Sequence, residues 1–250
     1  MQVQITQPDT RVVSIKVNHM KNHDNSDIKI VKIEDGTTIF LTQNFGSFFP
    51  NITEYYVMGV KLQYITRRDF RGIENIESLS FYGNSIEEIP EDAFFDLKKL
   101  KFLSLALNKI ATIPLLLFYS LCDLEEITLR GNSIESFPSF VFANNKQLSG
   151  IYLSNNRITS FSSDLVLKVP KLKEINLSSN TCINNNFNFE VINDDDLKHE
   201  ISLYVLSQCY LNNNFNFIVN KQCETDLKTC KNRVESLLAE NKALEDSKKS

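Results

Sequence analysis

The chain has 250 residues, of which 42% are hydrophobic and 23% charged, and its formal net charge at pH 7 is −4. This composition is ordinary for a folded chain, and the length allows one elongated domain with appendages. The near-neutral charge and the lack of a basic face or a known nucleic-acid motif argue against nucleic-acid binding. No run of 18 apolar residues occurs, so we predict no transmembrane segment.

Residues 1–27 are mostly polar and contain one predicted strand at 12–17, followed by a turn rich in Asn, Asp and His. We expect this region to be the remnant of an N-terminal cap. His19, His23 and Asp24 could form a metal site, but no further ligand recurs at a useful spacing, and a solvated loop is the competing interpretation. The first residues, MQVQITQPDTRVV, contain no signal-peptide core, so we expect an N-terminal segment to be missing.

From Ile28 onward one pattern returns every 24 residues. The clearest copy is LKFLSLALNKIATIPLLLFYSLCD, which begins at Leu100. We predict two degenerate units, four regular units and one terminal unit, with starts at residues 28, 52, 76, 100, 124, 148 and 172. A repeat of this length is typical of a solenoid, here built from leucine-rich repeats.

The first, fourth and sixth positions of each unit are apolar, which predicts a short strand with one buried face. One unit cannot bury this face alone, whereas stacked units can, so each neighbour adds stability. The ninth position is an asparagine in five units, and a column of asparagines can satisfy backbone groups where the chain leaves the strand. Apolar columns on the return side, one of them Phe70, Phe94, Phe118 and Phe142, predict an aromatic spine, and prolines beside them favour turns over helix.

The terminal unit places Cys182 where earlier units have isoleucine, and Cys209 follows a predicted helix that begins at the acidic residues 194–196. We expect a Cys182–Cys209 disulfide that pins this segment over the last repeat. The three aspartates could instead bind calcium, although the spacing of an EF-hand loop is absent. The Asn-rich segments 184–189 and 212–217 are interpreted as polar linkers.

Residues 222–250 carry a heptad pattern with a lone asparagine in the seam, which is typical of a parallel two-stranded coiled coil. The predicted seam consists of Leu227, Val234, Leu237, Asn241 and Leu244, together with Cys223 and Cys230. Cysteines at seam positions face their counterparts in a parallel dimer, so Cys223 and Cys230 are predicted to form interchain disulfides. The alternative is an amphipathic helix that packs on its own domain.

These pairings leave Cys122 as the odd one of five cysteines, and we expect it to be a free, half-buried thiol. The pattern favours an oxidising compartment. Glycosylation sequons at Asn51 and Asn176 agree with this interpretation.

The repeat form LxxLxLxxNxIxxIPxxxFxxL resembles the typical 24-residue class of extracellular leucine-rich-repeat proteins, over residues 28–182. The C-terminal part of the chain is similar to that of the secreted leucine-rich-repeat immune proteins of mosquitoes and related flies. The shared features are NTC in the last repeat, a second cysteine after it, and CETDLKTC running into a coiled coil. This resemblance implies an extracellular haemolymph protein that dimerises through disulfides and a coiled coil. It further implies that the protein holds complement-like thioester proteins on pathogen surfaces.

The predicted fold class is α/β: a solenoid with a parallel sheet on its concave face and an irregular convex side. Its expected parts are the cap remnant at 1–27, the solenoid at 28–182, a C-terminal cap and linker at 183–221, and the helical coiled-coil tail at 222–250. Outward positions of neighbouring strands group large side chains that suit a protein partner. These candidate binding residues are Tyr56, Met58, Tyr82, Phe102, Leu107, Arg130 and Tyr152. Single exposed apolar residues are also commonplace, which is the competing interpretation.

The sequence therefore predicts a non-enzymatic protein-binding scaffold that forms homo- or heterodimers. A structural or adhesive repeat protein, a piece of a receptor ectodomain and an intracellular adaptor are the alternatives. We find no phosphate loop, no G-x-S-x-G, no H-E-x-x-H and only three histidines, so neither an enzyme nor a cofactor is predicted.

Overall fold

The computed structural model describes residues 2–6, 12–16, 25–34, 41, 45–138, 141–160, 169–188 and 209, with 2–6 and 12–16 described as backbone only. The strands are β1 (Gln2–Thr6), β2 (Val12–Lys16), β3 (Ile30–Ile33), β4 (Glu54–Val57), β5 (Ser78–Ser80), β6 (Phe102–Ser104), β7 (Glu126–Thr128), β8 (Gly150–Tyr152), β9 (Glu174–Asn176) and β10 (Asn186–Asn188). The helical turns are the 3₁₀ segments η1 (Asn25–Asp27) and η2 (Arg67–Phe70) and the α-helix α1 (Phe45–Phe48).

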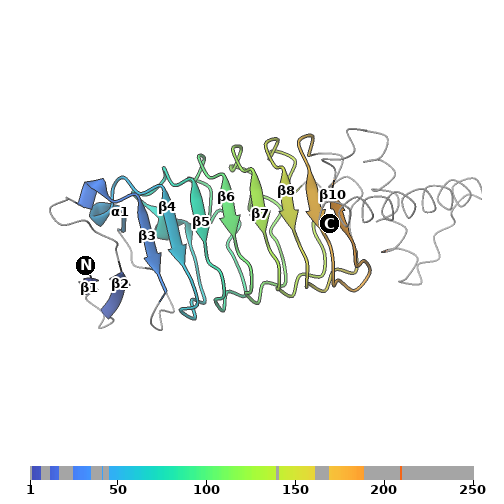
Figure 1. Ribbon diagram of the computed structural model, residues 1–250, viewed down its shortest axis with the longest axis horizontal. Helices are drawn as coiled ribbons and strands as arrows, with labels where there is room; N and C mark the ends of the chain where they lie inside the picture. Colours follow the sequence, from blue (N-terminus) through green and yellow to red (C-terminus); the bar gives the residue numbers. More distant parts are fainter. Residues whose placement is uncertain are drawn as a thin grey trace, which may run out of the picture.

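The strands form one sheet in chain order, with β3 to β9 parallel, so the chain winds as a stack of coils (Figure 1). Every parallel pair has the same offset: Ile30 faces Glu54, and Glu54 faces Ser78. Further along, Gly150 faces Glu174. Partners are therefore always 24 residues apart, which confirms the period read from the sequence and extends it through the two degenerate units.

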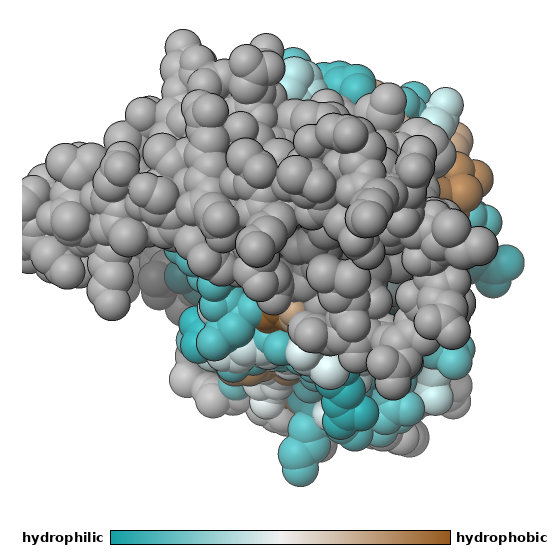
Figure 2. All heavy atoms as spheres, turned by 90° about the vertical axis from the view of Figure 1, so that its right-hand side faces the viewer, coloured by the Kyte–Doolittle hydropathy of each residue, from teal (hydrophilic) through white to brown (hydrophobic). Residues whose placement is uncertain are grey.

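The core is a set of stacked apolar columns that run the length of the solenoid. Leu79, Leu103, Ile127, Ile151 and Ile175, at the fourth position, are fully buried. A buried aliphatic side chain of this size contributes roughly 1.5–3 kcal/mol. Seen from the β10 end, the coloured part of the surface is mostly hydrophilic, with hydrophobic surface at the right-hand edge of the view and in smaller areas below its centre (Figure 2).

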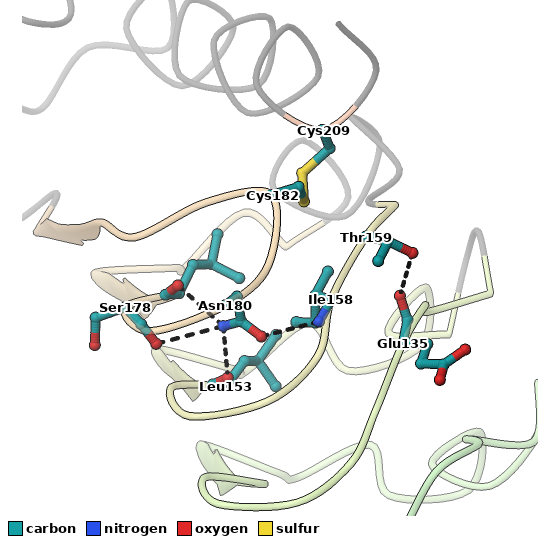
Figure 3. Close-up of a disulfide and its surroundings, with 9 residues drawn as sticks. Glu135, Leu153, Ile158, Thr159, Ser178, Asn180, Cys182 and Cys209 are labelled. Atoms are coloured by element: carbon teal, nitrogen blue, oxygen red, sulfur yellow. Dashed lines mark hydrogen bonds between the residues drawn. A yellow bond between two sulfur atoms is a disulfide. The ribbon is translucent and has the colours of Figure 1, made fainter. Parts of the chain in front are cut away.

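A ladder of buried asparagines joins each coil to the one before it. In Asn108, Nδ2 donates to the carbonyl oxygens of Phe81 (2.9 Å) and Leu105 (3.0 Å), and Oδ1 accepts from the backbone nitrogen of Ile86 (3.1 Å). Asn84, Asn132, Asn156 and Asn180 repeat this pattern at the same offsets, and the Asn180 copy is drawn in Figure 3. One side chain thus satisfies a buried backbone donor and shares two buried carbonyl oxygens with the neighbouring asparagines of the ladder.

The convex side is built from turns, as the prolines predict. In successive coils, backbone nitrogens three residues later donate to the carbonyl oxygens of Pro90, Pro114 and Pro138. The phenylalanines Phe70, Phe94, Phe118 and Phe142 are buried beneath these turns. Their rings contact along the stack, with centroids 5.8 Å apart for Phe70 and Phe94 and 5.4 Å for Phe118 and Phe142.

The N-terminal region forms a hairpin. Strand β1 pairs antiparallel with β2 along its full length, and Lys16 of β2 pairs with Lys32 of β3. The sequence analysis expected only the second strand, so its description of residues 1–27 was incomplete. The segment QVQIT alternates apolar and polar residues and could have revealed β1.

At the other end, the interpretation of residues 184–189 as a linker was wrong. Residues Asn186–Asn188 form β10, which runs antiparallel to β9, and Phe187 between the two asparagines is only 1% exposed. A three-residue strand with its central side chain buried follows the period-2 rule even in an Asn-rich segment.

The Cα atoms of Cys182 and Cys209 lie 4.6 Å apart, a separation that suits the expected disulfide, which is drawn in Figure 3. The thiol of Cys122 is free but exposed, not half-buried as expected. It follows the buried Leu121 on a turn whose outward positions recur every three residues.

Several expectations lie outside the described residues and stay predictions. They are the site at 19–24, the helix from 194, the second Asn-rich segment and the coiled coil at 222–250 with Cys223, Cys230 and its seam. The domain boundaries at 27, 182 and 221 are likewise not tested.

We predict that Asn108→Ala lowers the free energy of unfolding by about 2 kcal/mol, because it leaves the buried backbone N–H of Ile86 unpaired, which costs about 1–3 kcal/mol. The oxygens of Phe81 and Leu105 keep the hydrogen bonds from Asn84 and Asn132. Urea denaturation measures this change. Lys109→Ala, at the exposed neighbouring position, is the matched control and should cost less than about 1 kcal/mol. Equal losses in the two variants would show that the ladder does not bind the coils together.

Candidate functional site: the concave sheet

The outward side chains of β4 to β9 line the concave face in columns, one residue from each coil. The third-position column is Glu54, Ser78, Phe102, Glu126, Gly150 and Glu174. The fifth-position column is Tyr56, Ser80, Ser104, Thr128, Tyr152 and Asn176. In the fifth-position column, Ser80, Ser104 and Thr128 separate Tyr56 from Tyr152, and in the third-position column Ser78 and Gly150 interrupt the large side chains.

The first group lies just beyond the strands, where Met58, Tyr82 and Leu107 occupy three successive coils; we call it the distal ridge. Tyr82 is 47% exposed and Leu107 45%, while Ala106 beside them is buried. Glycines occupy the eighth position in the flanking coils, at Gly83 and Gly131. The two large side chains therefore project above a floor of small residues.

Leu107 has a backbone conformation that leucine rarely adopts. Its φ is +55°, and the equivalent residues Gly59, Gly83, Gly131, Asn155 and Ser179 all have φ between +56° and +71°. In the coils from Gly59 to Asn155 this conformation accompanies one backbone hydrogen bond: the nitrogen of the eighth residue donates to the next coil, as from Leu107 to the Arg130 oxygen at 2.8 Å. Glycine accepts a positive φ freely, whereas a residue with a Cβ incurs about 1–2 kcal/mol.

Burial of the Leu107 side chain does not offset the cost of this backbone conformation. The Leu107 side chain lies over Gly131, where a Cβ would collide with its Cδ2, yet nearly half of it remains exposed. A smaller residue would satisfy the same position at a lower cost. Leucine at this position therefore has no folding explanation in its surroundings, and strained backbone with an exposed side chain is typical of functional surfaces.

Arg130 adds a cation beside the ridge. It is exposed, and among the residues that the structure describes no carboxylate forms an ion pair with it. Arginine and tyrosine are the residue types most enriched at binding hot spots.

Tyr56 forms a separate group with polar partners. Its hydroxyl donates to Glu54 Oε2 at 2.7 Å and lies 3.0 Å from Ser78 Oγ, and the ammonium of Lys32 sits 5.4 Å from its ring centroid. Burial raises the pKa of Tyr56 above its ordinary value, so the phenol stays neutral. Phe102, half-buried two strands away, lies beside the exposed Lys101–Glu77 ion pair (2.7 Å).

The C-terminal third of the face is acidic. Gly150 leaves a gap between Glu126 and Glu174, and Tyr152 folds over it: a Cβ on Gly150 would lie 3.1 Å from Tyr152 Cε2 and 3.3 Å from Glu126 Cγ. The Tyr152 hydroxyl donates to Glu174 Oε2 at 3.0 Å. Burial raises the pKa of Glu126, and the charge of Glu174 raises it further. Tyr152 thus belongs to this acidic group and not to the distal ridge, since one coil lies between it and the coil of Leu107.

Residues 63–193 match the model of the BspA-type leucine-rich repeat region, in six copies. The chain belongs to the leucine-rich repeat family. Its repeat motif resembles the typical 24-residue class, whereas the family model that matches it is the BspA type. No sequence match was found among curated proteins.

Solved structures similar to this leucine-rich repeat chain come from mosquitoes and a bacterium. The mosquito LRIM1/APL1C complex is 22% identical, covers 65% of this chain and 32% of that one, and superposes with a TM-score of 0.57. The Leptospira interrogans protein LIC12759 is 24% identical over 66% of this chain and 38% of that one, with a TM-score of 0.54. The mosquito APL1B repeat domain is 24% identical over 49% and 35%, with a TM-score of 0.46. The chain spans about a third of each structure, and the similarities to the LRIM1/APL1C complex and to LIC12759 show the fold alone.

The other predicted sites of the leucine-rich repeat chain are placed as follows. The Asn51 amide is exposed and donates to the Ser26 oxygen at 2.9 Å. Half-buried Asn176 accepts from the backbone nitrogen and hydroxyl of Ser178 (3.0 and 2.7 Å). Glycosylation of either stays a prediction. Within the described ranges, no three His, Cys, Asp or Glu residues cluster as metal ligands, and no helix there is long and apolar enough to cross a membrane.

We predict that Glu126→Gln stabilises the fold at pH 7 by about 0.5 kcal/mol, a figure kept small because the group is partly solvated. The pKa of Glu126 in the folded state lies above its ordinary value of 4.5. Its contribution to stability is therefore present below that value and is lost as the pH rises through the folded-state pKa. The gain should shrink towards pH 4 in urea titrations. The exposed Glu125→Gln serves as control; a gain at Glu126 that is equal at both pH values would contradict the explanation.

Proposed function

We propose that this chain is a secreted recognition protein that binds a protein partner on its concave face, through the distal ridge and Arg130. Leucine-rich repeat solenoids are generally protein-binding scaffolds. The observation that carries the proposal is Leu107, an exposed leucine in a backbone conformation that the other coils assign to glycine, asparagine or serine.

The ridge suits a partner with an apolar centre and a carboxylate beside it. Tyr82 and Leu107 supply apolar surface that a partner can bury. Because the asparagine ladder holds the backbone beneath them, little conformational entropy is lost on binding. Arg130 supplies a charge that a carboxylate can pair with in two hydrogen bonds. This combination, a central apolar contact with a polar rim, is the usual anatomy of a protein interface.

The immune role, the extracellular location and the thioester-protein partner rest on the sequence resemblance and the cysteine pattern. The LRIM1/APL1C structure is that of a complex between two leucine-rich repeat proteins, which supports a protein partner for a chain of the same fold. The heptad pattern at 222–250, with Cys223 and Cys230 in its seam, supports a covalent homo- or heterodimer.

We predict that Leu107→Gly weakens binding of a purified complement-like thioester protein at least about tenfold, because it removes a central contact. The same change should leave the stability unchanged or raise it by up to about 1 kcal/mol, because glycine relieves the positive φ. Biolayer interferometry and urea denaturation measure the two effects. Tyr64→Ala, at an exposed tyrosine away from the concave columns, is the control.

The possible outcomes test the identity of the partner and the location of the binding surface separately. If the wild-type chain does not bind the thioester protein, the partner assignment is wrong. If it binds and both Leu107→Gly and Tyr82→Ala bind equally well, the ridge is not the binding surface.

We predict that the chain, secreted from insect cells behind a supplied signal peptide, migrates as a disulfide-linked dimer on a non-reducing gel. Reduction, or replacement of both Cys223 and Cys230 by serine, should convert it to a monomer, because these thiols face each other across the predicted coil. A monomer in every lane would exclude disulfide dimerisation through this segment.

A further inference from the structure

The convex turns of two neighbouring coils present parallel outward rows. In residues 114–124 and 90–100, backbone nitrogens donate to carbonyl oxygens three residues earlier, including Tyr119 to Leu116 (3.0 Å) and Phe95 to Asp92 (3.0 Å). Bonds of this type repeat the side-chain direction every three residues. The outward rows are therefore Leu116, Tyr119 and Cys122 on one coil, and Asp92, Phe95 and Lys98 on the coil before it.

Four large apolar side chains are exposed on these turns. Phe95, Leu115, Leu116 and Tyr119 each have between 47% and 54% of their surface exposed. Phe95 and Tyr119 occupy the same repeat position on adjacent coils, so the four form one convex patch. The largest apolar patch on a protein surface is often an interaction site.

The patch is held in place by its neighbours. The Arg67 guanidinium stacks 4.6 Å from the Phe95 ring centroid and is paired with both carboxylate oxygens of Asp96 at 2.6 and 2.7 Å. Glu91 Oε1 accepts from the backbone nitrogen of Leu116 at 3.3 Å. A patch whose side chains are already oriented loses less entropy on binding.

Charges at the ends of the first row complement each other. Asp92 lies at one end, Phe95 in the middle and Lys98 at the other, with Glu91 and Lys99 repeating the signs beside them. All four charged residues are exposed, and none forms an ion pair with another part of the chain that the structure describes. Because the row is acidic at one end and basic at the other, two copies of it that run in opposite directions place opposite charges against each other.

We propose that the convex patch binds a second copy of this chain through a two-fold axis parallel to the solenoid. A two-fold interface places the same surface of both copies together, so residue i contacts j and j contacts i. This axis reverses each row: Asp92 faces Lys98 of the second copy, Phe95 and Tyr119 face their own counterparts, and Leu116 faces Cys122. The apolar side chains meet at the centre and the charges form the rim, as interfaces require.

The interface is separate from the concave site and from the predicted coil, so it would add a second contact between chains. A chain with both contacts could form assemblies larger than a dimer. In such assemblies the concave faces of the two copies point away from each other and remain open to partners.

The first test is a designed cross-link in the full chain with Cys223 and Cys230 replaced by serine. Leu116→Cys introduces a thiol that faces Cys122 of the second copy, so mild oxidation should yield a covalent dimer. Within one copy the two positions are six residues apart, about 12 Å at a rise of 2.0 Å per residue, which is too far for a disulfide. Leu116→Cys with Cys122→Ser is the matched control and should yield no covalent dimer on a non-reducing gel.

The second test reverses the rim charges and follows self-association by sedimentation velocity. Asp92→Lys and Lys98→Asp alone should each weaken association at least about tenfold, because like charges then face each other. The two changes together should restore it, since every rim pair is again opposite in sign. The proposal would be overturned if the double variant associated as weakly as the single variants, or if Leu116→Cys gave no cross-link. It would also be overturned if the wild-type chain did not self-associate through the convex patch.

Discussion

The structure depends on the hydrogen bonds that each buried asparagine makes to the preceding coil. A solenoid coil leaves the strand by a sharp turn, and the backbone groups at that turn are buried by the next coil, where water cannot satisfy them. One asparagine per coil provides both donors and the acceptor that the turn needs. Because an insertion or deletion would move the side chain off its partners, the ladder also fixes the 24-residue register of the sheet.

Once the ladder fixes the backbone, outward positions are free to vary, and the face acquires separate chemical regions. The same third-position column carries glutamate at Glu54 and Glu126, phenylalanine at Phe102 and no side chain at Gly150. The backbone constraint becomes visible only where a residue conflicts with it. Leu107 is such a residue, since a positive φ recurs at its position in the neighbouring coils.

The sequence predicted the coil frame, the buried columns and the asparagine ladder, because each is an apolar or amide pattern that repeats with one period. It could not show that Tyr152 folds over Gly150, because that contact depends on one glycine in a neighbouring position of the same strand. It also missed strand β10, since an Asn-rich composition concealed a single buried phenylalanine, Phe187. Residues Leu115, Leu116, Phe95 and Tyr119 lie beside buried neighbours in apolar runs, so pattern alone did not separate the outward row from the inward one.

The ladder is also directional. Every asparagine bonds to groups of the coil before it and to its own, and none reaches forward to the coil after it. Losing a coil from the C-terminal side therefore removes the asparagine that bonds to the coil left behind, and water can then reach the backbone groups that this coil had covered. Losing one from the N-terminal side exposes an asparagine, whose side chain water can solvate. The stack thus resembles a polar filament with two unlike ends: one end presents backbone groups without the asparagine of a following coil, and the other presents an asparagine without the backbone groups of a preceding coil.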